Sequence, residues 1–155
     1  MGHHITGLAA SRETFAMLGS LLSRQPHFAL RENFGFLPLD DENLDDVVGL
    51  DTGNTLGGFK YLTQNLVDLL REASRSAAFA YIETNYFGGV GVQGAAVFRE
   101  GEIVYGPVCA ERGTINGALV LLGVPVQPGT SDAFAAIGLD RLRYNDDYRE
   151  ETSSA

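Results

Sequence analysis

Residues 79–105 read FAYIETNYFGGVGVQGAAVFREGEIVY, and this stretch decides the fold. Its first part, Phe79–Phe87, is rich in aromatic and β-branched residues, which favour the pleated surface of a sheet. Apolar residues then alternate along Val90–Arg99, as they do in a half-buried strand. Gly88-Gly89 and Glu100-Gly101 supply turn residues before the next apolar run, Glu102–Tyr105. The stretch therefore predicts three consecutive antiparallel strands.

More strands are expected on the N-terminal side. The apolar run Ile5–Ala9 predicts a first strand, and two short strands are expected at Phe28–Leu30 and Phe34–Leu39. A tight turn near Glu32-Asn33 would join the last two, because asparagine tolerates the backbone angles of such turns. Tight turns require antiparallel neighbours, so the sheet is expected to be mixed or antiparallel, with about six strands.

Helical periodicity fills the gaps between the strands. Apolar residues recur at helical spacing over 12–24 and most clearly over 56–74, and shorter helices are expected to begin at Thr114 and Ser131. The element order is then β-α-β-β-α-β-β-β-α-α, which predicts an α+β fold with helices packed on the sheet. Residues 1–143 are expected to form a single domain, and 144–155 a polar, frayed tail.

The charge and cysteine content of this 155-residue chain limit the classes of partner and the cellular location that we expect for it. Twenty Asp and Glu against eleven Lys and Arg leave a formal net charge of −9. An acidic chain is a poor ligand for nucleic acid phosphates and for anionic membrane surfaces, so neither is expected as a partner. A lone Cys109 excludes a disulfide scaffold and, without a signal peptide at the start, suggests a reducing, cytoplasmic location.

Two short motifs match the residue patterns of known sites but lack the structural context that those sites require. Gly89, Gly91 and Gly94 spell G-x-G-x-x-G, but a dinucleotide site needs a helix to begin there, and a hairpin turn follows instead. We therefore interpret these glycines as bent sheet backbone and expect no cofactor. Asp51-Thr52-Gly53 matches the aspartic-protease triplet, yet a polar turn leading into a helix cap at Asn54 or Thr55 explains it better.

Metal and thiol chemistry have little support. His3 and His4 are adjacent, so on a strand they would point to opposite faces, and no histidine pair has metal-ligand spacing. No metal site is expected. Cys109 has no histidine near it in sequence and is interpreted as an inert, buried thiol.

Glu83 is the one candidate for acid–base chemistry. It follows Tyr81 on the expected strand, and we expect its side chain on an exposed face. If that face were covered, the carboxylate would need hydrogen-bonding partners, and a nearby tyrosine could exchange protons with it. The alternative to a non-catalytic protein is thus a small-molecule site or small enzyme near the glycine bend; it would use Glu83, Tyr86, Gly88, Gly89 and Gly91.

An acidic stretch dominates the charge pattern. Residues 32–59 hold seven acidic residues and no basic one. A helical turn with Leu44, Val47 and Val48 facing inward would line carboxylates along its outer face. Clustered carboxylates steer association with basic surfaces. The residues expected to form this partner-binding face are Asp40, Asp41, Glu42, Asp45, Asp46 and Asp51.

Three segments of the chain also resemble known sequences. AYIETNYFGGVGVQGAAVF at 80–98, INGALVLLGV at 115–124 and DAFAAIGLDRLR at 132–143 look like a group of small uncharacterised bacterial proteins, of which Tyr-Phe-Gly-Gly-x-Gly is the most distinctive part. In composition the chain resembles bacterial toxin-immunity proteins. That resemblance implies a non-catalytic inhibitor that binds a basic protein such as a toxin. A homodimer through an exposed sheet edge stays open.

Overall fold

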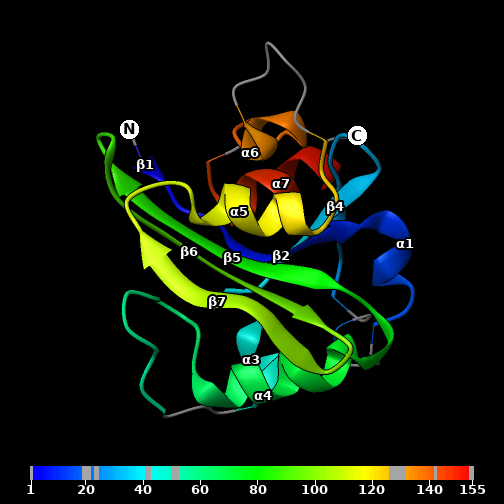
Figure 1. The fold of residues 1–155 in the computed structure, drawn as a ribbon. Coiled ribbons are helices and arrows are strands. Elements are labelled where there is room, and N and C mark those ends of the chain that lie inside the picture. Colours follow the sequence, from blue (N-terminus) through cyan, green and yellow to red (C-terminus); the bar gives the residue numbers. More distant parts are fainter. Residues whose placement is uncertain are drawn as a thin grey trace.

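The computed structural model describes residues 2–18, 22, 25–40, 43–49, 53–125, 132–141 and 143–153. Its centre is a seven-stranded antiparallel sheet with helices on both faces (Figure 1). The α+β class is confirmed, and of the two sheet types predicted the antiparallel one is present.

The sheet places its longest strands side by side. The strand order is β3 (Phe28–Ala29), β4 (Phe34–Pro38), β2 (Thr6–Ser11), β5 (Phe79–Phe87), β6 (Val90–Arg99) and β7 (Glu102–Ala110), and the short β1 (Gly2–His3) also pairs with β5. Strand β5 is therefore the central strand of the sheet, with β1 and β2 along one edge and β6 along the other. The three C-terminal strands agree with the segments predicted from residues 79–105, and β7 is five residues longer than expected.

The predicted turns are confirmed by their backbone angles. The φ angles are +64° and +83° at Gly88 and Gly89, and +60° and +59° at Glu32 and Asn33. Two consecutive residues with positive φ match the right-handed twist of the flanking strands, which is why short hairpins favour them. The same pattern recurs at the Glu100-Gly101 turn.

The glycine-rich segment is sheet backbone, as expected. Strand β6 runs without interruption through Gly91 and Gly94, and no helix begins there. A Cβ atom on Gly91 would clash with the carbonyl oxygen of Asn85 on β5. A Cβ on Gly94 would press against Phe59 and Cys109. These glycines therefore allow close approach of neighbouring groups.

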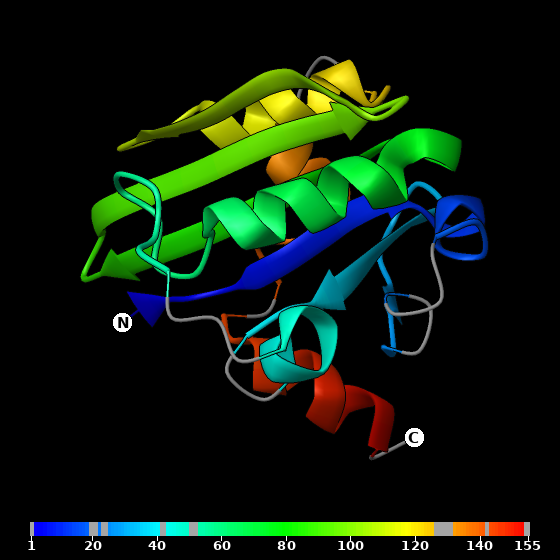
Figure 2. The ribbon, with the colours of Figure 1, turned by 90° about the horizontal axis from the view of Figure 1, so that it is seen from below.

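Helices cover the sheet on both sides. In Figure 1, α3 (Leu44–Val48) and α4 (Gln64–Ala73) lie below it, while α5 (Thr114–Leu121), α6 (Ala133–Ala136) and α7 (Asn145–Ser153) lie above it. Figure 2, seen from below, shows α4 in front of the sheet, running in nearly the same direction as its long strands. Because both faces are covered, alternate residues of β5 enter two different apolar cores: Tyr81 lies in the lower core and Ile82 in the upper one.

The long helix predicted over 56–74 is wrong at its start. Helix α4 begins at Gln64, where the Thr63 side chain accepts a hydrogen bond from the Leu66 amide, and a 3-10 turn follows at Ser74–Ser76. Residues 56–62 form a loop, and Phe59 and Leu62 are still buried. The apolar spacing thus reflects burial, while the backbone amides of this loop bond elsewhere. The helix cap expected at Asn54 or Thr55 is therefore also wrong.

Two other helix predictions need correction. The helix expected over 12–24 begins as α1 (Arg12–Phe15) and gives way to a turn at 16–17; residues 19–21, 23 and 24 lie outside the described residues. The expected cap Ser131 is also outside them, and Asp132 caps α6 by accepting a hydrogen bond from the Ala135 amide.

The C-terminal segment is not frayed at its start. Helix α7 occupies Asn145–Ser153, and Tyr148 packs its ring against Phe36 of β4, with 5.0 Å between ring centroids. Asn145 and Tyr148 are both buried. The expectation of a polar tail failed because two of its residues, a tyrosine and an asparagine, have specific partners in the sheet.

Candidate functional site

Glu83 is buried, which corrects the expectation of an exposed side chain. Only 5% of the residue is accessible to solvent. Its Oε1 atom accepts a hydrogen bond from the Lys60 amide at 2.6 Å, and Oε2 accepts from the amides of Tyr61 at 3.0 Å and Leu62 at 3.2 Å. The Tyr81 hydroxyl also donates to Oε2, at 2.6 Å.

This carboxylate explains the local fold of the loop before α4. Three consecutive amides that would otherwise sit in the first turns of the predicted helix point instead at Glu83, 21 to 23 residues further along the chain. Each is a charge-assisted hydrogen bond, stronger than a neutral one. Glu83 thus ties the loop over the sheet, and both of its oxygens are occupied within the protein.

The surroundings of Glu83 favour neutral partners. Burial, and secondarily the Glu83 charge and its hydrogen bond, raise the pKa of Tyr81 well above its usual range. Burial, followed by the same charge, raises the pKa of Cys109 to about 11. Cys109 is only half-buried, but its raised pKa agrees with an inert thiol.

Most of the alternative ligand site lies away from this carboxylate. Tyr86 points to the opposite face of β5 from Glu83, donates its hydroxyl to the Glu111 carbonyl and accepts a hydrogen bond from Gln93. Gly88 and Gly89 form the tip of the hairpin, with open space where side chains would be. Phe87 and Val90 flank this tip and are each 79% exposed. The structure therefore does not bring the five residues together.

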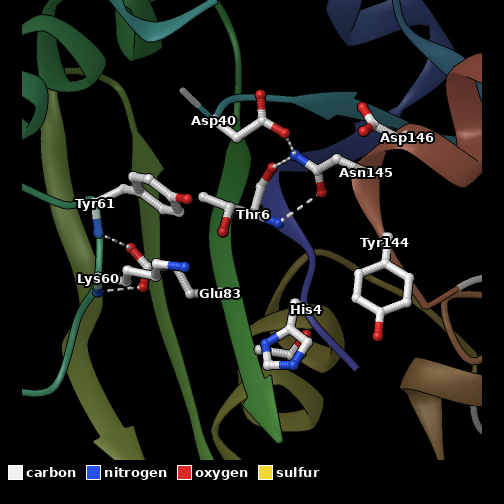
Figure 3. Close-up of a pocket in the computed structure, with 10 residues that line it drawn as sticks. His4, Thr6, Asp40, Lys60, Tyr61, Glu83, Tyr144, Asn145 and Asp146 are labelled. Atoms are coloured by element: carbon white, nitrogen blue, oxygen red, sulfur yellow. Dashed lines mark hydrogen bonds between the residues drawn. The ribbon is translucent and has the colours of Figure 1, made fainter. Parts of the chain in front are cut away.

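A cavity of about 190 Å³ opens beside Glu83 at the start of β2 (Figure 3). Its walls come from five separate parts of the chain: the N-terminal strands, the end of β4, the loop before α4, strand β5 and the start of α7. The lining residues are His4, Thr6, Asp40, Lys60, Tyr61, Glu83, Thr84, Tyr144, Asn145 and Asp146. Half of these ten residues are carboxylates or tyrosines, and the first and last lining residues, His4 and Asp146, lie 142 positions apart in the sequence.

Asn145 joins the two sides of the cavity. Its side chain pairs with the Thr6 backbone as a neighbouring strand would, accepting from the Thr6 amide at 2.9 Å and donating to the Thr6 carbonyl at 2.8 Å. It also donates to Asp40 at 2.8 Å. Arg149, one turn further along α7, pairs with Asp40 at 3.2 Å and with Asp146 at 2.9 Å. These contacts hold α7 against the acidic segment after β4.

The acidic stretch is divided by the fold. Asp40 is directed inward into the network around Asn145, whereas Asp45 and Asp46 are exposed on α3. The other expected members, Asp41, Glu42 and Asp51, lie outside the described residues. Asp146 of α7 joins the same region, although its sequence neighbourhood predicts a polar tail. An Asn-Asp-Asp run at 145–147 is typical of a helix start and could have revealed α7.

A second hollow of about 380 Å³ adjoins the first. It lies between α3 and α4 and shares Lys60 and Tyr61 with the cavity at Thr6. Its floor includes Leu44, Val48 and Leu66, and Asp45 stands at its side. The two hollows therefore form one polar-rimmed surface that extends from α3 to the start of α7.

The described residues contain no group of three or more His, Cys, Asp or Glu side chains that could hold a metal ion. The His3 ring lies between two oxygen atoms: its Nδ1 is 2.7 Å from the Thr84 hydroxyl, and its Nε2 is within hydrogen-bonding distance of the Leu139 carbonyl. His4 stacks on Tyr144. Both histidines are thus used in packing β1 and the following residue against the rest of the domain.

Comparison of the chain with models of known protein families, with curated protein sequences and with solved structures found no match in any of the three. Among the helices of the described residues, none combines the length and the apolar character needed to cross a membrane.

Proposed function

We propose that this protein is a non-catalytic binding protein of the inhibitor or immunity type, which docks through an acidic surface on a basic protein partner in the bacterial cytoplasm. The observation that carries the proposal is the meeting of two acidic segments, Asp40–Asp46 and the start of α7, through the Asn145–Asp40 hydrogen bond across 105 positions. Carboxylates gathered on one surface speed association with a basic partner and oppose acidic ones.

The state of Glu83 supports a non-catalytic role. A general acid or base has to reach the proton that it transfers. Both oxygens of Glu83 already accept hydrogen bonds from the protein itself, and the Tyr81 hydroxyl donates its proton to one of them, Oε2. This arrangement suits a structural anchor beneath the binding surface.

The docking face can be tested by charge reversal. Asp45 and Asp46 are exposed and form no ion pair with another described residue, so D45K/D46K should leave the fold intact. A matched control with the same change of net charge is E100K/E102K, at the turn between β6 and β7. Association of each variant with the partner, once identified by cross-linking in the host, is followed by stopped-flow at low and physiological salt.

We expect D45K/D46K to lower the association rate constant at least tenfold at low salt, with a smaller effect at high salt because ions screen exposed charges. The control should stay within about twofold of the parent protein. Equal effects of both pairs would mean that net charge alone matters, and no effect of either would remove α3 from the interface.

A second candidate function is the binding of a small molecule, and the cavity beside Glu83 is the observation that favours it. The cavity has converging polar groups, as ligand sites do. At about 190 Å³ it is smaller than the roughly 300–1,000 Å³ typical of pockets for drug-sized ligands. A free ligand would therefore be no larger than a single amino acid side chain.

A further inference from the structure

Thr6 presents an unused hydroxyl to the cavity. The residue is 6% exposed, and its backbone amide and carbonyl are both held by Asn145. Figure 3 shows its side chain directed toward Lys60 and Tyr61, across the cavity. Within the described residues this hydroxyl has no hydrogen-bonding partner. The hydroxyl borders the cavity, so it is available to hydrogen-bond a group that enters there.

The charges around Thr6 indicate what that group is. Three carboxylates line the cavity, those of Asp40, Glu83 and Asp146; they face the ammonium of Lys60 and the guanidinium of Arg149, so one negative charge is left unbalanced. Lys60 is exposed and lies over the Tyr61 ring, with 5.3 Å from Nζ to the ring centroid. Its long side chain can swing into solvent while its stem stays in place. The cavity is thus suited to a cation and hostile to an anion.

The walls also match the shape of a guanidinium group. Tyr61 and Tyr144 offer aromatic faces, on which arginine stacks more readily than lysine. A guanidinium group carries five N–H donors in a planar fork and no acceptor. The Thr6 hydroxyl and Oδ2 of Asp146 can accept from such a fork, whereas the oxygens of Glu83 and Asp40 already accept hydrogen bonds within the protein. Arg149 of α7 already provides an example within the protein, because its guanidinium group bridges the carboxylates of Asp40 and Asp146.

We infer that the cavity at Thr6 receives one arginine side chain of the basic partner. The inference rests on the proposed function and deepens it: exposed Asp45 and Asp46 steer the partner, and the cavity binds a single residue of it. A site of this kind selects among basic partners, because a surface without a projecting arginine at the right place gains steering and no anchor.

The inference can be tested without the partner. The parent protein, labelled with ¹⁵N, is titrated with N-acetyl-arginine amide, with the lysine analogue, and with the citrulline analogue, which keeps the shape and loses the charge. At physiological salt we expect saturable shifts from the arginine analogue, centred on the amides of Lys60 and Tyr61 and on the Asn145 side chain. The lysine analogue should bind several-fold more weakly, and citrulline should not saturate.

Two variants separate the cavity from the docking face. T6V removes only the unused hydroxyl, and D146N removes one exposed carboxylate; each should weaken arginine-analogue binding about three- to tenfold. D45K/D46K should leave it within about twofold. Shifts that are equal for citrulline and arginine, or that survive both cavity variants, would overturn the inference.

The outcomes also distinguish failure of the arginine site from failure of the docking face. If D45K/D46K slows partner association while no analogue binds at Thr6, the docking face stands and the arginine site is wrong. If the arginine analogue binds at Thr6 and D45K/D46K leaves partner association unchanged, the cavity is a cation site of a protein whose docking face lies elsewhere.

Discussion

Replacement of Glu83 by glutamine tests the anchor beneath the binding surface. Glutamine has nearly the same size, so E83Q changes hydrogen bonding with little change in packing. Its single carbonyl oxygen can take the Oε2 position and accept from Tyr61, Leu62 and Tyr81. The amide nitrogen then faces the Lys60 N–H, and two donors oppose each other where a 2.6 Å hydrogen bond stood.

The magnitude follows from these four contacts. Hydrogen bonds to charged groups contribute about 1.5–3 kcal/mol each and neutral ones about 0.5–1.5 kcal/mol. E83Q loses one charge-assisted bond outright and turns the other three into neutral ones, and the relief of burying no charge offsets part of this. We expect the free energy of unfolding to fall by about 2–4 kcal/mol. Y81F removes one donor and leaves the carboxylate well bonded, so it should cost about 1 kcal/mol.

Urea unfolding followed by circular dichroism gives both free energies, and hydrogen exchange reports on the loop. In E83Q the amides of Lys60, Tyr61 and Leu62 should exchange faster than in Y81F, while the amides of β5 and β6 remain protected. If E83Q were within about 0.5 kcal/mol of the parent protein and these three amides kept their protection, the Glu83 carboxylate would not anchor the loop.

Three further results are expected. The pKa of Tyr81 in the folded protein lies above its unfolded value of 10.0, so its contribution to stability is complete below pH 10 and is lost as the pH rises further. Y81F lacks this titrating group. Its urea midpoint should therefore fall less steeply above pH 10 than that of the parent protein. With a pKa of about 11 against an ordinary 9.0, Cys109 should react with a thiol reagent at pH 8 about 100-fold more slowly folded than unfolded in urea; equal rates would refute the raised pKa. N145L leaves the Thr6 amide and carbonyl without the Asn145 partner and should cost about 2–4 kcal/mol; proteolysis within residues 144–153 should accelerate, and unchanged cleavage would contradict the role of Asn145 in holding α7.

Much of the fold could be predicted because its signals are local. A hairpin turn needs two residues that tolerate positive φ, and Gly88-Gly89 and Glu100-Gly101 provide them in the sequence itself. Alternation along Val90–Arg99 similarly marks a strand whatever lies on its two faces. Helix α4 was located by its apolar spacing, but its start was not, because the three amides before it are captured by a carboxylate distant in sequence.

The candidate site was harder to predict for the same reason. Asp45 and Asp46 were placed on an exposed helical face from the spacing of Leu44, Val47 and Val48. Asp40 has the same chemistry and only a few residues separate it from them, yet it faces inward, since Asn145 and Arg149 arrive from α7 to meet it. Nothing near Asp40 in sequence carries that information.

The amino-acid sequence by itself determined the antiparallel hairpins, the α+β class and the acidic character of residues 32–59, because backbone angles, periodicity and charge are properties of neighbouring residues. Only the tertiary structure decided that Glu83 is buried and bonded, that α7 packs on the sheet, and that Thr6 opens into a cavity. Burial depends on what covers a residue, and here the covering groups come from the loop at 59–62 and from α7.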